Sequence, residues 1–269
     1  MAQLINHNGV IQSESEFSIS PFNRGLAFGD GFFETCLFDK GNCKLWKFHL
    51  ARIEKGLKLL SLNLDFKLNQ LIDEVQKVID SNSQCRVKIT FYRKGLGAYT
   101  PTTNDSAFLV TSKPFEIDRS DNKGLKCDFA NEIYVHSNSL GIKTLSSLNY
   151  IRAAIEKQKR KLDDLILFNE KGEIAEATAS NIWWFKNDTV YTPSSVCGGV
   201  EGVFKSYLIQ LLKEEEITCR EGQFSRKDLL DADEVFLTNA VHGIRPIGTV
   251  DGSFFKSKIS HYLIDMVSF

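Results

Sequence analysis

The chain has 269 residues, a formal net charge of -1, 42% hydrophobic residues and 25% charged residues. A chain of this length can bury a substantial core without disulfides or metal ions to hold it together. The near-zero net charge gives no general electrostatic reason to expect nucleic acid or an acidic membrane as a partner, so a small molecule is the favoured class of ligand.

The cysteines and the N-terminal segment indicate the compartment. Six scattered cysteines form neither a C-x-x-C pair nor the spacing of a zinc site, so the sequence predicts free thiols and no metal. The first twelve residues are too polar for a signal peptide, and no apolar run is long enough to cross a bilayer. We therefore expect a cytoplasmic protein.

Strand and helix patterns alternate in the first half of the chain. Asn8-Gly9 between two short apolar runs is typical of a type I′ hairpin. Leu50, Ile53, Leu57 and Leu60 recur at helical spacing. In chain order, the patterns predict a hairpin of strands 32–38 and 43–48 around the turn DKGN, helices at 50–60 and 68–79, and strands at 85–92 and 106–115.

The second half has the same mixture. Its patterns predict strands at 127–135, 164–168, 173–177, 181–185, 189–193 and 234–241, and helices at 146–162, 202–215 and the C-terminus. Residues 116–124 are polar and lack periodicity, as in a linker. We expect an N-terminal α+β lobe at 1–115, this linker, and a C-terminal lobe at 125–269. The fold class is α+β, or mixed α/β, with an active site in the cleft between the lobes.

Lys143 is isolated from other charges. It is the only formally charged residue between Glu132 and Arg152. Such a lysine can be an ordinary solvated side chain before a helix. Alternatively, weak solvation lowers its pKa and makes the amine a nucleophile or a base.

A glycine-rich segment leads into a predicted helix. Gly198, Gly199 and Gly202 precede Val203 and Phe204, whose backbone N–H groups could bind a phosphate together with the helix dipole. A tight loop without a ligand is an equal alternative. A Walker A loop is excluded, because Phe204 stands where its second glycine belongs.

Two further side chains admit a structural and a functional interpretation. Arg52 borders the apolar stripe of a predicted helix, where it either reaches water or holds a phosphate. Glu176 is the only acid between Glu173 and Asp188. It is either an exposed strand carboxylate or a buried acceptor that keeps a heteroaromatic nitrogen protonated.

Six segments in order resemble the class IV aminotransferases, the fold-type IV enzymes that use pyridoxal 5'-phosphate. RGLAFGDGFFET resembles the family's F-G-D-G-x-F/Y-E signature, FHLARI its H-x-x-R motif, and GIKTLSSLNY the segment that carries the Schiff-base lysine. EATASNIWW matches E-x-x-x-S-N, GGVEGVFKSYL resembles the phosphate loop, and LTNAVHGIRPIGTVDG resembles the last turn that contacts the cofactor. The resemblance covers nearly the whole chain.

This resemblance implies roles for particular residues. Lys143 is then the catalytic lysine that forms the Schiff base, and Glu176 contacts the ring nitrogen. Arg52 and the amides of Val203 and Phe204 bind the cofactor phosphate, with Thr238 and Asn239 as weaker candidates. The resemblance also implies a two-lobe fold like that of D-amino-acid aminotransferase and a homodimer.

Within the family the chain looks most like the aminodeoxychorismate lyases, which form 4-aminobenzoate and pyruvate for folate biosynthesis. The alternative is an aminotransferase for branched-chain or D-amino acids with a 2-oxo acid acceptor. A protein that keeps the fold without catalysis ranks last, because the lysine, glutamate and arginine are all present.

The substrate site stays open at this point. Many of these lyases have R-G-Y where this chain has Gly97-Ala98-Tyr99, so an arginine for a substrate carboxylate is missing. Arg93, His242 or Arg245 could replace it, and Phe33 and Tyr99 are further candidates for substrate contact. The partner of the cofactor's phenolic oxygen is also open, with Ser146 and Ser147 as candidates.

Overall fold

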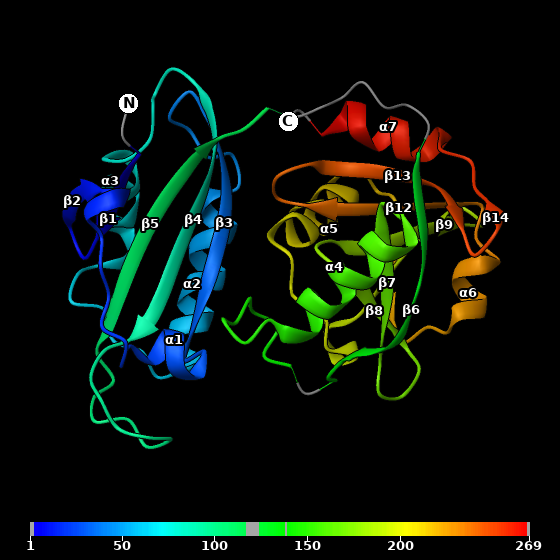
Figure 1. Ribbon diagram of the computed structural model, residues 1–269. Helices are drawn as coiled ribbons and strands as arrows, with labels where there is room; N and C mark the ends of the chain where they lie inside the picture. Colours follow the sequence, from blue (N-terminus) through cyan, green and yellow to red (C-terminus); the bar gives the residue numbers. More distant parts are fainter. Residues whose placement is uncertain (1–2, 117–123, 138, 268–269) are drawn as a thin grey trace. The chain divides into compact units, whose positions relative to one another are not determined.

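Residues 3–116, 124–137 and 139–267 are described in a computed structural model, and the chain divides into two units (Figure 1). One comprises residues 1–117 with 142–146, and the other comprises residues 118–141 with 147–269. The sequence analysis placed segment 142–146 in the C-terminal lobe, whereas it packs with the first unit. Residues 117–123 of the expected linker lie outside the described residues.

The first unit is built on an antiparallel five-stranded sheet in the order β2-β1-β5-β4-β3. Asn8 and Gly9 join β1 to β2 with φ angles of 52° and 85°. Positive φ at both residues is what a type I′ turn requires, so the predicted hairpin is confirmed. The strands are β1 (Leu4–His7), β2 (Val10–Ser13), β3 (Gly31–Asp39), β4 (Gln84–Arg93) and β5 (Ser106–Pro114).

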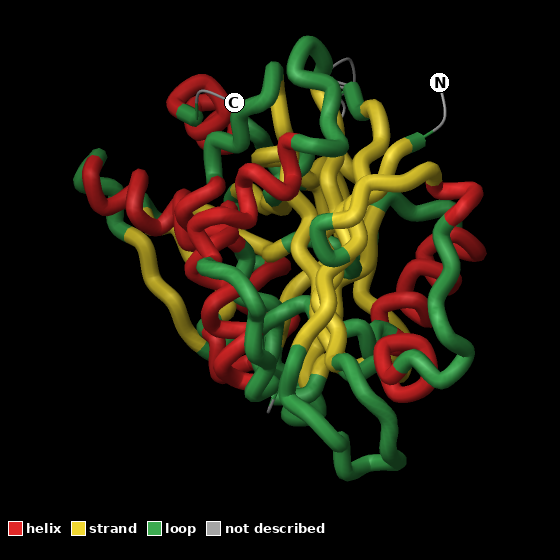
Figure 2. Tube along the Cα trace, turned by 90° about the vertical axis from the view of Figure 1, so that its left-hand side faces the viewer, coloured by secondary structure: helices red, strands yellow, loops and turns green. Residues whose placement is uncertain are grey.

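Helices cover one face of this sheet. Phe32 and Cys36 of β3 share a buried cluster with Ile53 of α2 and Val75 of α3. Residues 94–104, between β4 and β5, form a long loop, drawn in green in Figure 2. The helical segments of the unit are η1 (Glu14–Glu16), α1 (Arg24–Phe28), α2 (Trp46–Leu59), η2 (Leu68–Gln70) and α3 (Leu71–Gln76).

The prediction of a strand at residues 43–48 is wrong, because α2 begins at Trp46. β3 pairs with β4 over its whole length instead. His49, Arg52, Ile53 and Gly56 recur at three- and four-residue spacing and are the buried residues of α2. In a helix these four side chains lie on one face and can all pack on the sheet. In a strand, neighbouring side chains point to opposite faces, so some of the four would face solvent.

The second unit contains a nine-stranded mixed sheet. Its order is β11-β10-β9-β12-β13-β6-β7-β8, and β14 pairs with β13. Ile174 of β8 and Trp184 of β9 lie far apart in this order but belong to one buried cluster, so the sheet curls around a common core. The strands are β6 (Leu125–Val135), β7 (Asp164–Asn169), β8 (Ile174–Ala177), β9 (Asn181–Lys186), β10 (Thr189–Pro193), β11 (Cys219–Gly222), β12 (Glu234–Asn239), β13 (Gly243–Val250) and β14 (Ser253–Phe254).

Helices flank this second sheet. Ala153 of α4 packs against Ile133 and Leu167, which confirms the predicted helix with slightly shorter bounds. None of the helices in the described ranges is long and apolar enough to cross a membrane. The helical segments of the second unit are α4 (Leu148–Arg160), η3 (Ser195–Cys197), α5 (Val203–Glu214), α6 (Arg226–Leu230) and α7 (Lys258–Met266).

Candidate active site

The backbone of Lys143 is anchored to the edge of β3. Phe33 N donates a hydrogen bond of 2.8 Å to Lys143 O, and Leu145 N donates one of 3.0 Å to Gly31 O. Phe32 and Thr144 form an antiparallel bridge between them. Segment 142–146 is therefore bonded along the edge of the first sheet, which fixes the starting point of the Lys143 side chain.

The glycine signature before β3 lies against the same segment. Gly29 has φ of +65°, and a Cβ there would lie 2.5 Å from Ser146 Oγ. A Cβ on Gly31 would lie 2.1 Å from Phe91 O. Both glycines are thus required by close packing: a side chain at Gly29 would displace the lysine segment, and one at Gly31 would clash with the backbone of β4.

Two lysines approach the ring of Phe33. Lys143 Nζ lies 5.8 Å from the ring centroid and Lys88 Nζ lies 4.6 Å from it. Lys88 is exposed on β4, whereas Lys143 is half-buried. Partial burial lowers the pKa of Lys88. The aromatic ring therefore gives both amines an apolar neighbour.

Arg52 is held by a buried carboxylate. Its Nε and Nη2 donate to the two oxygens of Glu34 at 2.6 and 2.7 Å, and His49 Nδ1 lies 2.7 Å from Glu34 Oε2. Burial alone would raise the pKa of Glu34, but Arg52 and His49 outweigh it and lower the pKa to about 2. Glu34 is therefore ionised and can only accept, so His49 Nδ1 carries the proton that it shares.

Glu176 is a buried carboxylate in the second unit. It is only 3% exposed, because β8 lies inside the curled sheet. Tyr150 donates its hydroxyl hydrogen bond to Oε1, and Val200 N donates to Oε2 at 3.0 Å. Burial, and then the Glu176 charge, raise the pKa of Tyr150 well above its usual range. These two donors fix the orientation of the carboxylate.

The glycine-rich loop before α5 is tightly packed. Gly198 has φ of +89°, and a Cβ on Gly202 would lie 1.9 Å from Asn181 Oδ1. A Cβ on Gly199 would lie 3.4 Å from Glu176 Cδ. Gly202 is the N-cap of α5 and has no side chain to bond the first helical amides. The loop thus presents backbone N–H groups beside the Glu176 carboxylate.

Thr238 and Asn239 lie at the end of β12. Thr238 is 1% exposed, and its Oγ1 accepts a hydrogen bond of 2.8 Å from Trp183 Nε1. Asn239 Oδ1 accepts from the backbone amides of Val241 and His242 at 3.0 and 2.8 Å. Asn239 therefore stabilises the turn that leads from β12 to β13.

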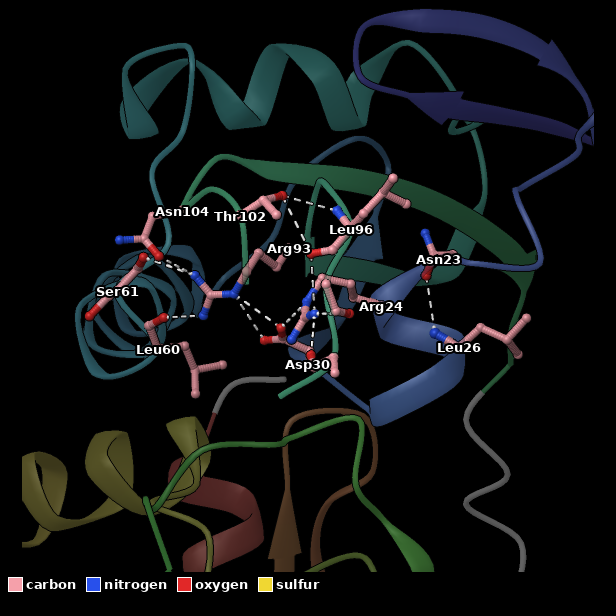
Figure 3. A network of polar contacts seen from close by, with 12 residues as sticks. Asn23, Arg24, Leu26, Asp30, Leu60, Ser61, Arg93, Leu96, Thr102 and Asn104 are labelled. Carbon is pink, nitrogen blue, oxygen red and sulfur yellow. Dashed lines mark hydrogen bonds and ion pairs between the residues drawn. The ribbon is translucent and has the colours of Figure 1, made fainter. Parts of the chain in front are cut away.

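Arg93 is committed to structural contacts within the first unit (Figure 3). Its Nε donates to Asp30 Oδ2 at 3.0 Å, and Nη2 donates to Leu60 O at 2.6 Å. Nη1 donates to Asn104 Oδ1 at 2.7 Å and to Ser61 O at 3.3 Å. These bonds engage all three nitrogens of the guanidinium group, so Arg93 ties the loop of residues 94–104 to the sheet.

The other substrate candidates lie in different surroundings. Tyr99 is 91% exposed at the tip of the loop of residues 94–104. In the second unit, Arg245 Nη2 lies 3.4 Å from Ser180 Oγ and 3.7 Å from Asp164 Oδ2. His242 is half-buried in the turn after β12. His242 and Arg245 thus lie near each other in the sequence, where the chain passes from β12 into β13.

The sequence analysis missed several positioning residues. Arg24 Nη1 donates to Gly97 O and Ala98 O at 2.9 and 2.7 Å, and its Nε donates to Asp30 at 2.8 Å. Arg24 and Asp30 belong to the glycine-rich signature, so that motif was the available signal. Tyr150 and Glu176 each lie in a segment that resembles a family motif, but no sequence pattern pairs the two across the 26 residues that separate them.

The chain belongs to the class IV aminotransferase family, because a family model described as "Amino-transferase class IV" matches residues 31–250. The aminodeoxychorismate lyase of Bacillus subtilis is 28% identical over 260 residues, which cover 92% of this chain and 87% of that protein. A putative branched-chain-amino-acid aminotransferase of Methanocaldococcus jannaschii is 26% identical over 257 residues, covering 93% and 89%.

The fold is shared with solved structures. The branched-chain amino acid aminotransferase of T.th., solved with pyridoxamine 5'-phosphate, superposes with a TM-score of 0.88 at 20% identity, covering 98% of this chain and 92% of that one. The predicted fold class is therefore confirmed.

Proposed function

We propose that this chain is a pyridoxal-phosphate-dependent lyase that converts 4-amino-4-deoxychorismate to 4-aminobenzoate and pyruvate. The proposal rests on the lyase of Bacillus subtilis, which aligns over 92% of the chain and is named for this reaction. The candidate site must then supply an amine, an acid for the ring nitrogen and a phosphate site.

The residues of the chain fit this cofactor. The loop at Gly198–Gly202 leaves no room for a Cβ at Gly202, and it leads into the first turn of α5, which begins without a side-chain cap. A helix N-terminus of this kind binds phosphate groups. Glu176, oriented by Tyr150 and Val200, lies directly beside the loop and offers a fixed carboxylate to a ring N–H.

The cofactor, pyridoxal 5'-phosphate, supplies an electron-accepting ring that stabilises negative charge at the substrate Cα. Lys143 would hold the cofactor through Nζ, and its free amine would take the proton from the substrate Cα as a general base. Segment 142–146 holds this lysine on the edge of β3, so its side chain starts from a fixed backbone position.

Glu176 keeps the proton on the ring nitrogen, since an ionised carboxylate favours a protonated neighbour. Arg52 and the amides of Val203 and Phe204 hold the phosphate, and Glu34 fixes the plane of the Arg52 guanidinium. Thr238 contributes its hydroxyl near the same loop, and Asn239 shapes the adjoining turn.

The substrate carboxylate binds to Arg245 or His242 in our proposal. Our proposal does not give this role to Arg93, because its donors bond Asp30, Asn104 and backbone carbonyls. We also assign Phe33 and Tyr99 to contacts with the carbon ring of the substrate. We further propose that the enzyme is a cytoplasmic homodimer that supplies 4-aminobenzoate for folate.

A second candidate is an aminotransferase for branched-chain or D-amino acids. The relative from Methanocaldococcus jannaschii, at 26% identity over 93% of this chain, favours it. The same lysine, glutamate and phosphate loop would serve both reactions. The aminotransferase requires a 2-oxo acid as acceptor, whereas the lyase does not.

The cofactor lysine is tested by the visible spectrum of wild type, Lys143→Ala and Lys88→Ala. Lys88 is a matched control, because its amine also lies beside the Phe33 ring. Wild type and Lys88→Ala should show the absorption band of a cofactor joined to lysine, and Lys143→Ala should lack it. A band that persists in Lys143→Ala would assign the cofactor to another lysine.

The reaction is tested by offering aminodeoxychorismate without any 2-oxo acid. Release of 4-aminobenzoate and pyruvate by wild type, lost in Lys143→Ala, supports the lyase. Absence of both products, together with amino transfer from branched-chain or D-amino acids to a 2-oxo acid, would replace the lyase by the second candidate.

A further inference from the structure

Three metal-binding side chains meet inside the first unit. Cys36 lies on β3, Cys43 lies in the connection to α2, and His49 lies in the first half of α2. The two Sγ atoms and a ring nitrogen of His49 all lie within 4.8 Å of one another. Cys36 and His49 are buried, and Cys43 is partly exposed. Cys36 and Cys43 have no role in the proposed reaction, and His49 is linked to it only through Glu34, which also holds Arg52.

Within the described part of the chain, His49 has one ring nitrogen that is hydrogen-bonded and one that is not. Its Nδ1 is hydrogen-bonded to Glu34 Oε2 at 2.7 Å. Its Nε2 is buried and has no hydrogen-bond partner among the residues that the structure describes. A buried polar atom without a partner costs free energy, so such an atom calls for a ligand. The proton shared by Nδ1 and Glu34 leaves Nε2 with its lone pair.

The surroundings of His49 match those of metal-bound histidines. A histidine that binds a metal through one nitrogen commonly donates its other N–H to a carboxylate, which fixes the ring and the tautomer. Glu34 fills this position, and it is held from its other side by Arg52. This arrangement involves neither cysteine, and it leaves Nε2 as the nitrogen that an ion would bind.

We propose that Cys36, Cys43 and His49 bind a zinc ion. Two thiolates and one imidazole are ligands that Zn²⁺ prefers, and they exclude the oxygen-seeking ions Ca²⁺ and Mg²⁺. A tetrahedral site with Zn–S bonds of about 2.3 Å separates its sulfur atoms by roughly 3.8 Å. The Sγ atoms of Cys36 and Cys43 lie within 4.8 Å of each other, so they would need to move closer by about 1 Å or less to bind one ion.

Cys43 is the ligand that can move, and its partial exposure gives an ion access to the site. It lies between the turn after β3 and the first residue of α2, outside any helix or strand. A partly exposed residue in such a connection can move toward Cys36 and His49 without breaking regular structure. Water completes the fourth position of the ion in sites with three protein ligands.

Zinc binding releases protons and leaves the site without net charge. Each thiol releases its proton to solvent as its sulfur binds Zn²⁺, and His49 Nε2 binds as a neutral ligand. Two protons are therefore released for each ion, and the two thiolate charges neutralise the ion. No oxidation or reduction takes place.

The test uses the full chain, free of tags, stripped by a chelator and kept reduced with a phosphine. Zn²⁺ is titrated while metal content and released protons are measured, and Cd²⁺ is titrated to detect thiolate bonds by ultraviolet absorption. Cys36→Ser and Cys43→Ser are compared with wild type. Cys85→Ser and Cys219→Ser are the controls, since they match the burial of Cys36 and Cys43 respectively.

The site is supported if wild type and both controls bind one ion and release two protons, while Cys43→Ser binds at least tenfold more weakly. Loss of a supporting contact alone costs ten- to a hundredfold in metal affinity, so loss of a ligand should cost no less. Equal binding by wild type and Cys43→Ser, or no stoichiometric binding by wild type, would overturn it. If Cys36→Ser does not fold, the comparison with Cys43→Ser still decides.

Discussion

At the scale of the residue, Glu34 organises the polar centre of the first unit. It is 1% exposed and contacts both Arg52 and His49 of α2. Its pairing partners lie 15 and 18 residues further along the chain. A buried charge without its partner is strongly unfavourable, so this group must be satisfied by Arg52.

We predict that Arg52→Ala lowers the stability of the protein without cofactor by roughly 3–5 kcal/mol, because it leaves Glu34 buried and unpaired. Arg86→Ala is the control. It removes an exposed arginine from β4 and should change the free energy of unfolding by less than about 0.5 kcal/mol. Urea denaturation measures both. Similar small losses in the two variants would contradict the structural role of the pair.

Tyr150 tests the orientation of Glu176. In Tyr150→Phe the carboxylate loses a hydroxyl donor, and a hydrogen bond to a charged group contributes about 1.5–3 kcal/mol. We expect kcat to fall by roughly ten- to a hundredfold, with the cofactor still bound. The control Tyr134→Phe removes a hydroxyl that is exposed on β6 and should keep full activity. An unchanged kcat in Tyr150→Phe would show that Val200 suffices to hold Glu176.

At the scale of the element, α2 packs unusually close to β3. A Cβ on Gly56 would lie 2.8 Å from Phe32 Cε2, and Phe32 is 1% exposed. Glycine costs about 1 kcal/mol of helix propensity relative to alanine, so close packing must compensate for it. The glycine lets α2 carry His49 and Arg52 to the sheet.

We predict that Gly56→Ala destabilises the first unit, although alanine favours helices. Alanine gains about 1 kcal/mol in helix propensity over glycine. Overpacking of a core costs about 1–3 kcal/mol, so over most of this range the cost is larger than the gain. The double variant Phe32→Leu with Gly56→Ala should be more stable than the sum of the single effects, because the smaller side chain makes room. Thermal unfolding of the four proteins measures the coupling, and strict additivity would argue against the contact.

At the scale of the whole molecule, apolar side chains are exposed on α1 and on the loop of residues 94–104. Leu26 is 66% exposed and Tyr99 is 91% exposed, and the Tyr99 ring lies 5.9 Å from that of Phe28. Exposed apolar groups of this size favour association. They support the proposal that the enzyme is a homodimer.

We predict that the double variant Leu26→Glu with Tyr99→Ser shifts the protein from the mass of two chains to that of one. Light scattering at a fixed concentration measures the mass. Phe254→Ser is the control, since Phe254 is 87% exposed in the second unit and should leave the dimer intact. A dimer that survives the double variant, or a wild type that is monomeric, would contradict the role of this surface.

The sequence by itself determined the type and order of most elements. Local patterns such as Asn8-Gly9 and the helical spacing of residues 50–60 depend on neighbours in the chain, so they can be recognised without the fold. It also determined the family resemblance and the candidates Lys143, Arg52 and Glu176, because each stands in a short motif. The prediction of a strand at residues 43–48 was wrong, because which residues of a segment are buried depends on the sheet that it packs against or pairs with.

Only the tertiary structure decided which residues share a neighbourhood. It showed that segment 142–146 packs with the first unit, that Arg93 bonds Asp30, and that Tyr150 bonds Glu176. It also brought Cys36, Cys43 and His49 together although their spacing fits no zinc motif. These contacts join residues from separate elements, and the packing of helix on sheet, which no local pattern encodes, sets their distances.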